Sequence, residues 1–246
     1  MKKNWFIDWF NSPFYHKLYF KRDEDEAEMF ITQLINHLNP EKKSSMLDVA
    51  CGKGRHSKTL AQQGFSVTGI DISEDSIAFA KHLENENLEF YQHDMRLPFR
   101  INYYDFVFNI FTSFGYFNSR RENEDALHTI TSSLKPGGIL ILDYLNIHYV
   151  ANRLVYNEEK IIDKTHYEIH RWHDTTYFYK RIRVTDPSLQ VPMEHIEKVE
   201  KISLGDFTDM FSYQHLQVQE VFGNYQLHDF DVKASPRLIL IAQKLK

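Results

Sequence analysis

A short segment near residue 50 has the residue types and spacing of a ligand-binding loop. A short apolar run that ends at Asp48 leads into a stretch in which Gly52 and Gly54 stand two positions apart, and an amphipathic segment follows. Glycine adopts positive φ and lets a ligand approach the main chain closely. A helix after such a loop points its N–H groups at the ligand. The pattern predicts a strand, a ligand-binding loop and a helix, with an ordinary connecting turn as the alternative.

A carboxylate follows the next predicted strand. Residues 67–70 are mostly apolar, and Asp71 comes directly after them. In open α/β sheets a carboxylate at the end of the second strand binds ribose hydroxyls, so we expect Asp71 to bind both hydroxyls of a nucleoside-containing cofactor. The dinucleotide fingerprint G-x-G-x-x-G requires a third glycine. Ser57 stands at that position, which argues against NAD.

Composition limits the possible partners and compartments. The chain has 246 residues, 42% of them hydrophobic, and a net charge of −5 without a dense Lys/Arg run. Nucleic-acid surfaces are usually basic, and a membrane helix needs about 20 apolar residues, so we expect neither partner. The N-terminus lacks the features of a signal peptide. The single cysteine, Cys51, excludes an internal disulfide and fits the cytoplasm. We expect a cytoplasmic monomer or homodimer.

Several segments in order resemble one enzyme family. Residues 48–54, Asp-Val-Ala-Cys-Gly-Lys-Gly, resemble motif I of class I methyltransferases that use S-adenosyl-L-methionine (SAM). The turn Leu-Lys-Pro-Gly-Gly at residues 134–138 is similar to a second landmark of that family. Tyr15, Tyr19 and Arg22 are spaced as in the N-terminal segment of sugar N-methyltransferases of the class, and the aromatic segment 110–117 also resembles that subgroup. The resemblance covers residues 15–145 strongly and the C-terminal end fairly well.

The resemblance implies a set of cofactor-binding residues. They lie in the glycine loop, at the strand ends and in the N-terminal segment: Tyr19, Arg22, Asp48, Ala50, Cys51, Gly52, Gly54, Asp71, Ile72, Asp94, Met95, Asn109 and Phe111. Tyr19 and Arg22 would lie near the methionine part of SAM, where Arg22 could pair with its carboxylate. Asp94 would accept a hydrogen bond from the adenine amino group, unless it only forms a turn. Cys51 would fill space beside the cofactor, with a catalytic thiol as the alternative.

The acceptor site is less specified. The aromatic segment after the predicted strand 104–108 could form the wall of a pocket that includes Phe114, Tyr116, Phe117 and Asn146, or it could simply pack against the N-terminal segment. No catalytic base is identified, since His56, His148 and Tyr149 are candidates by position only. None of the thirteen histidines has metal-ligand spacing, so no metal is expected. We expect transfer to nitrogen or oxygen of a small-molecule acceptor.

The predicted fold is α/β. We expect a Rossmann-like seven-stranded sheet with helices on both faces and its last strand antiparallel, which NAD-binding folds lack. Period-2 alternation in residues 164–173, 176–185 and 193–202 predicts a small antiparallel sheet inserted after the fifth strand. Its charged residues would form a solvated face or contact substrate. The expected division is a methyltransferase domain of residues 1–146 and 203–246 and an inserted sub-lobe of residues 147–202.

Residues 1–22 contain eight aromatic residues before the first long predicted helix, which covers residues 23–38. One interpretation is a lid that orders over the cofactor and excludes water from the reaction. The other is a helix packed permanently on the sheet edge. Two functions compete with methyl transfer: a non-catalytic SAM-binding protein and, less favoured, an NAD-dependent oxidoreductase.

Overall fold

The computed structural model describes residues 5–19 and 24–246. Its central sheet has seven strands, in the order β10-β11-β5-β4-β1-β2-β3. Their bounds are β1 Ser45–Val49, β2 Ser66–Asp71, β3 Leu88–Gln92, β4 Tyr104–Asn109, β5 Leu134–Leu145, β10 Leu216–Phe222 and β11 Arg237–Lys244. Neighbours from β5 to β3 are parallel, whereas β11 pairs antiparallel with both β5 and β10. This confirms the predicted fold class, including the antiparallel last strand.

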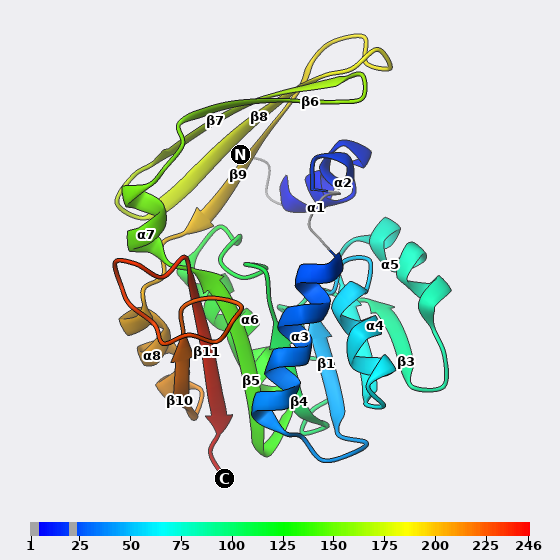
Figure 1. Ribbon diagram of the computed structural model, residues 1–246, viewed down its shortest axis with the longest axis vertical. Helices are drawn as coiled ribbons and strands as arrows, with labels where there is room; N and C mark the ends of the chain where they lie inside the picture. The colour runs from blue at the N-terminus through cyan, green and yellow to red at the C-terminus, as the bar shows by residue number, and fades with distance from the viewer. Residues whose placement is uncertain (1–4, 20–23) are drawn as a thin grey trace.

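Helices cover both faces of this sheet (Figure 1). One face carries α3 (Glu24–Leu38), α4 (Arg55–Gln62) and α5 (Glu74–Ala80), and the 3-10 turn η1 (Lys81–Leu83) follows α5. The other face carries α6 (Arg120–Ser133) and α8 (Leu204–Tyr213). Successive side chains of a strand point to opposite faces. In β5, Leu140 and Leu142 therefore pack in the core under α6 and α8, while Ile141 packs under α3 and α4.

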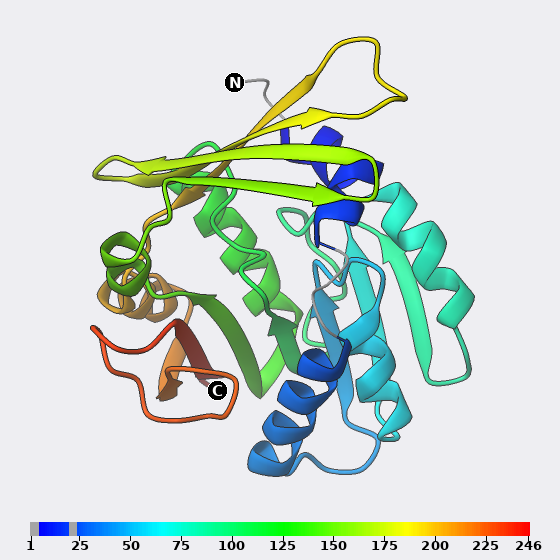
Figure 2. The same cartoon turned by 45° about the horizontal axis from the view of Figure 1, so that its top comes forward.

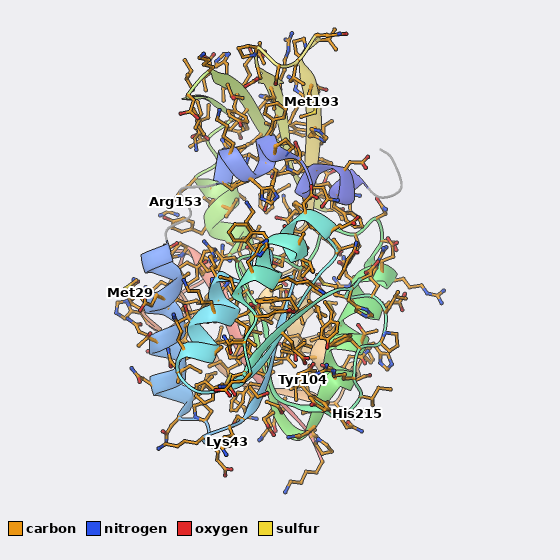
Figure 3. The ribbon with its side chains drawn as sticks, turned by 90° about the vertical axis from the view of Figure 1, so that its right-hand side faces the viewer. Met29, Lys43, Tyr104, Arg153, Met193 and His215 are labelled. Carbon is orange, nitrogen blue, oxygen red and sulfur yellow. The ribbon has the colours of Figure 1, made fainter. Side chains whose placement is uncertain are left out.

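A second sheet lies across the carboxyl edge of the first (Figures 1 and 2). It is antiparallel, in the order β6-β7-β8-β9, with bounds Asn157–Ile162, Thr165–His173, Tyr177–Thr185 and Met193–Glu200, and the short helix α7 (Ile147–Asn152) precedes it. Figure 3 shows Met193, on this sheet, and Lys43, just before β1, at opposite ends of the molecule. The four-stranded sheet therefore faces the end of the main sheet at which ligands bind in open α/β folds.

Two short helices, α1 (Trp5–Phe10) and α2 (Pro13–Tyr19), lie between the four-stranded sheet and the main body (Figure 2). Trp9 is fully buried, and its ring stacks on that of His195 in β9 with 4.5 Å between centroids. Phe6 packs edge-on against Phe117 of the main body at 5.7 Å. The N-terminal helices therefore contact β9 of the four-stranded sheet and the loop after β4 of the main body.

Some boundaries differ from the sequence predictions. The Lys-Pro-Gly-Gly segment does not form a turn ahead of the fifth strand, because β5 already begins at Leu134, which pairs with Tyr104, and includes these residues as an irregular start with Gly137 at φ 83°. Strand β6 was missed because its sequence does not alternate, as expected for an edge strand exposed along most of its length. Within the described ranges, no helix is long and apolar enough to cross a membrane.

Candidate cofactor and acceptor site

A cavity of about 610 Å³ lies at the carboxyl ends of β1, β2 and β4. Its floor contains the glycine loop after β1, the end of β2 and the loop after β4. Its roof is formed by α1 and α2 together with Glu197 of β9. Segments that are far apart in the sequence thus enclose one space that could hold a cofactor beside a second small molecule.

The glycine loop brings its main chain to the cavity in a left-handed conformation. Ala50, Gly52 and Gly54 have φ values of 60°, 56° and 80°. A Cβ added at Gly52 would meet no atom within 4 Å, so the space beside this residue is open. A Cβ at Gly54 would lie 2.5 Å from the ring of Phe90. Gly54 therefore serves packing between the loop and β3, and its role in cofactor binding stays a prediction.

Asp71 ends β2 and supports the loop from below. Its Oδ2 accepts the backbone N–H of Gly52 at 2.8 Å, and its Oδ1 accepts that of Ser73 at 2.8 Å. Burial raises the pKa of the Asp71 carboxyl, and the N–H donors oppose that shift. Each carboxylate oxygen can accept more than one hydrogen bond, so these contacts leave capacity for ligand hydroxyls.

Asp48 lies under the loop and does not line the cavity. Its Oδ2 accepts the hydroxyl of Ser57 at 2.6 Å. Burial raises the pKa of Asp48 to about 7. Ser57, which occupies the position of the third fingerprint glycine, is thus the hydrogen-bond partner that ties α4 to β1.

The loop after β4 is held in an unusual conformation by a buried ion pair. Phe111 and Thr112 have φ values of 60° and 58°, which are uncommon for residues other than glycine. The N–H of Phe111 donates to Asp143 Oδ2 at 2.8 Å, and Arg237 Nη2 donates to Thr112 Oγ1 at 2.7 Å. Arg237 also pairs with Asp143 at 2.7 Å. Residues of β5 and β11 therefore fix the shape of this cavity wall.

Phe111 also connects several side chains at the floor. Its ring stacks on that of Tyr225 at 5.0 Å, and the guanidinium of Arg55 lies 4.4 Å from its centroid. His56 packs on the same ring at 4.9 Å. Burial holds the pKa of His56 well below its usual range, so this imidazole is neutral.

At the end of β3, Asp94 already has a protein partner. Arg96 Nη2 and Nε donate to its carboxylate at 2.6 and 3.1 Å, and Arg96 also reaches Glu122 at 3.0 Å. Burial raises the pKa of Asp94, but the hydrogen bonds and charge of Arg96 bring it below its usual value overall. Asp94 therefore stays ionised and fixed in place beside Met95 at the cavity wall.

The cavity brings together most of the residues predicted from the sequence. Its lining includes Tyr19, Ala50, Cys51, Gly52, Asp71, Ile72, Asp94, Met95, Phe111, Tyr116 and Phe117. Arg22 lies outside the described residues. Burial holds the pKa of the Cys51 thiol well above its usual range, which disfavours a catalytic thiolate. The roles of these lining residues in binding a cofactor or acceptor stay predictions.

Other predicted site residues lie away from the cavity. Asn109 is buried and donates its side-chain N–H to the carbonyl of Val49 at 3.1 Å. Phe114 is fully buried in the core under α8. Asn146 caps α7 and donates to the carbonyl of Ser235 at 2.8 Å. All three are buried outside the cavity lining, and His148 and Tyr149 likewise do not line it.

The sequence did not indicate His16, and it gave Glu197 only as one of many charged residues of the inserted sheet that could contact substrate; both line the roof. Both come from elements whose path over the cavity depends on long-range contacts, and no local motif marks them. Only the dense aromatic residues before position 20 hinted that the N-terminal segment covers something. No group of three metal-ligating side chains is found in the part of the chain that the structure describes.

Two buried nitrogen atoms indicate that the cavity suits a polar ligand. The Nε2 atoms of His16 and His56 are buried at its lining and have no hydrogen-bond partner among the described residues. Buried polar atoms are normally hydrogen-bonded. With the open main chain at Gly52 and the Asp71 carboxylate, this donor set fits a cofactor that carries a ribose and further polar groups.

Comparisons with known proteins agree with this geometry. The family model described as "Methyltransferase domain" matches residues 40–203. A Bacillus subtilis (strain 168) protein named as a methyltransferase, YqeM, is 29% identical over 72% of this chain and 82% of its own length. The dTDP-3-amino-3,4,6-trideoxy-alpha-D-glucopyranose N,N-dimethyltransferase of Streptomyces venezuelae is 33% identical over 52% of this chain, which spans about half (54%) of that relative.

Among solved structures, an S-adenosylmethionine-dependent methyltransferase from Clostridium acetobutylicum ATCC 824 superposes with a TM-score of 0.78. The match covers 95% of this chain and 97% of that one, at 16% identity. The match therefore extends well beyond the central sheet, and it supports a shared fold.

Proposed function

The chain belongs to the methyltransferase-domain family, and we propose that it transfers the methyl group of SAM to a nitrogen or oxygen atom of a small-molecule acceptor. The observation that carries this proposal is the single cavity in which the glycine loop, Asp71 and the loop after β4 meet under a roof. A concave site of this size suits a small acceptor better than a polymer. SAM supplies, when bound, a methyl group on a positively charged sulfur that is already activated for displacement.

The residues of the floor would hold the cofactor. The open main chain at Gly52 and the Asp71 carboxylate provide a backbone surface and a partner for ribose hydroxyls. Asp94 and Met95, at the other side of the floor, provide an acceptor and an apolar contact for the adenine. Tyr19 closes the site from above. Arg22 remains a proposed partner of the methionine carboxylate.

The chain contributes to the reaction mainly by position and enclosure. Holding the acceptor in line with the methyl group converts a bimolecular step into an effectively unimolecular one. The aromatic side chains of Phe10, Tyr116 and Phe117 exclude water from the acceptor side of the cavity. We further propose that residues 1–22 act as a lid and that residues 147–202 form a sub-lobe carrying the roof.

A pair of glycine variants tests the cofactor site. Gly52 and Gly64 both have positive φ and both would point a Cβ into open space, but only Gly52 lines the cavity. Gly52→Val and Gly64→Val should therefore cost similar backbone strain, about 1–3 kcal/mol of unfolding free energy. Calorimetry should show that SAM binds wild type and Gly64→Val, whereas Gly52→Val has lost it. Equal SAM binding in both variants would place the cofactor elsewhere.

The competing functions predict different ligands and products. An NAD-dependent oxidoreductase would bind NAD in the same calorimetric titration and show no heat with SAM. A non-catalytic SAM-binding protein would bind SAM but yield no methylated product from any acceptor. A screen for methyl transfer to small amines, alcohols and acids, run with SAM, separates this outcome from the proposed one.

A further inference from the structure

The roof of the cavity carries one carboxylate that has no part in the proposed cofactor site. Glu197 lies on β9, where alternation turns it, with His195 and Val199, toward the N-terminal helices. It is 9% exposed, and it lines the cavity. Its position on the four-stranded sheet, opposite the glycine loop, separates it from the residues that would hold the cofactor.

The two oxygen atoms of this carboxylate are used unequally. Oε1 accepts Trp9 Nε1 at 2.7 Å and the hydroxyl of Tyr19 at 2.8 Å. Oε2 forms an ion pair with Lys180 Nζ at 3.7 Å, which is longer than a hydrogen bond. Within the described residues Oε2 accepts no hydrogen bond, although a carboxylate offers about four acceptor positions. Glu197 can therefore accept a donor from a ligand without losing its protein partners.

The side chains around Glu197 are aromatic. Tyr19 packs against Tyr15 at 4.7 Å, Tyr15 packs against Phe10 at 5.1 Å, and Phe10 packs against Tyr116 at 5.6 Å, and all four line the cavity. Aromatic ring faces attract cations. The protein already shows this at the same place, because the Lys180 ammonium lies 4.6 Å from the Tyr19 ring centroid and donates to its hydroxyl.

We propose that Glu197 is a specificity-determining residue that selects an acceptor whose reactive group is an amine. The proposal rests on the proposed function, because it assumes that the cavity above the cofactor holds the acceptor. A carboxylate among aromatic rings stabilises an ammonium group through a charge-assisted hydrogen bond and ring contacts, and it offers an alcohol only a weaker neutral donor. The end of β9, three residues after Glu197, is fixed to the main body, because Glu200 N donates to the carbonyl of Gly115 at 2.9 Å in the loop after β4.

Methyl transfer to an amine also needs no base from the protein. The ammonium form of the acceptor releases one proton to the solvent before the cavity closes, and the neutral amine then donates an N–H to Glu197 while its lone pair forms the N–C bond. The C–S bond breaks with its electron pair remaining on sulfur, which becomes a neutral thioether. The product is the methylated ammonium, so Glu197 needs only to hold an N–H donor and does not need to accept the proton.

The experiment compares the affinities of an amine and an alcohol that have the same ring and nearly the same size. Cyclohexylamine and cyclohexanol are titrated by ligand-observed NMR into protein saturated with S-adenosylhomocysteine. Wild type should bind the amine at least about tenfold more tightly than the alcohol, as expected for a hydrogen bond to a charged group. Glu197→Gln, which keeps an acceptor oxygen but removes the charge, should reduce this preference to about threefold or less.

Two variants separate recognition from roof stability. Glu194→Gln removes an exposed carboxylate from the same strand, on the opposite face of the sheet, and should keep the wild-type preference. Trp9→Phe removes one hydrogen bond of Glu197 from behind and should lower the melting temperature while the preference remains. If Glu197→Gln keeps the amine preference, or if wild type shows none, the proposal is wrong.

The calorimetric titration of wild type with SAM is run in parallel. Failure of the proposed function would appear as absent SAM binding. Failure of the Glu197 assignment alone would appear as normal SAM binding together with equal affinities for the two probes.

Discussion

The floor and the roof of the cavity are held together by different kinds of interaction. The floor depends on backbone groups: Asp71 accepts two main-chain N–H groups, and Asp143 accepts that of Phe111. The roof depends on side chains, such as the Trp9 and Tyr19 contacts to Glu197. Each floor contact depends on only one side chain, the aspartate, and survives substitution of the residue that donates its N–H, whereas each roof contact depends on two side chains. The floor can therefore serve a common cofactor while the roof varies with the acceptor.

The region of the floor and the outer face of the four-stranded sheet differ in how their charges are buried. Asp48, Asp71 and Asp143 lie at or beneath the floor, and burial raises the pKa of all three. Glu197 and Lys180 of the roof are also mostly buried, whereas on the outer face of the four-stranded sheet the ion pair of Arg183 with Glu168 is about half exposed. Charge changes in the floor should therefore affect stability strongly, and charge changes on the outer face of the four-stranded sheet should affect it weakly.

The largest effect is expected from Arg237→Met. This variant leaves Asp143, which is fully buried, without its cation, and should lower the unfolding free energy by about 3–5 kcal/mol in urea denaturation. The control Arg183→Met breaks the exposed pair on the four-stranded sheet and should cost less than about 1 kcal/mol. Adding Asp143→Asn to Arg237→Met should restore part of the loss. Equal costs for the two single variants would remove the distinction between the buried charges beneath the floor and the exposed charges of the four-stranded sheet.

The floor could be predicted from the sequence because each of its parts is local. The glycine loop, Asp71 and the aromatic segment before Phe117 each follow a strand whose apolar pattern marks it, and parallel strands bring their carboxyl ends to one edge. The packing role of Gly54 was not predictable, because Phe90 belongs to another strand.

The roof could not be predicted in the same way. Its contacts join residues 148 to 188 positions apart, such as Lys17 to Thr165 and Trp9 to Glu197. Alternation revealed three of the four strands but not which element they cover. Asn146 is a residue that the sequence placed in the site although it lies outside the cavity. Its position after a strand suggested a site residue, whereas its side-chain amide donates to the carbonyls of residues 232 and 235.

The second prediction concerns cofactor binding by the floor. Asp71→Ala removes hydrogen bonds to a charged group and should weaken SAM binding by about 1.5–3 kcal/mol, or roughly tenfold or more, in calorimetry. Asp105→Ala is the matched control, because Asp105 also accepts a backbone N–H, from Ser45 at 2.8 Å, but at the opposite edge of the sheet. Unchanged SAM affinity in a folded Asp71→Ala protein would sink the assignment.

A third prediction uses the pKa of Asp48, which is raised from its usual value near 4 to about 7. Between these values the folded protein keeps a proton that the unfolded chain has lost. The free energy of unfolding of wild type should therefore fall as pH rises, and Asp48→Asn removes this dependence. The difference in unfolding free energy between the two proteins should change by about 1.4 kcal/mol from pH 5 to pH 6, in favour of the variant at the higher pH. Parallel stability curves would contradict this.

The smallest effect is expected at the contact between the N-terminal helices and the four-stranded sheet. Lys17 on α2 lies 3.0 Å from Asp163, which is 78% exposed, and donates to Thr165 at 2.9 Å. Lys17→Met should lower the free energy of local opening of α1 and α2 by less than about 1 kcal/mol, because exposed ion pairs contribute little. Native-state hydrogen exchange measures this directly. Amides of α2 should exchange faster in the variant, while those of β1 and β4 stay unchanged, since the floor does not depend on this contact. Binding of S-adenosylhomocysteine should slow α2 exchange in both proteins if the helices close over the site. A uniform increase in exchange across α2, β1 and β4 would instead show that roof and floor open as one unit, and the lid would lose its basis.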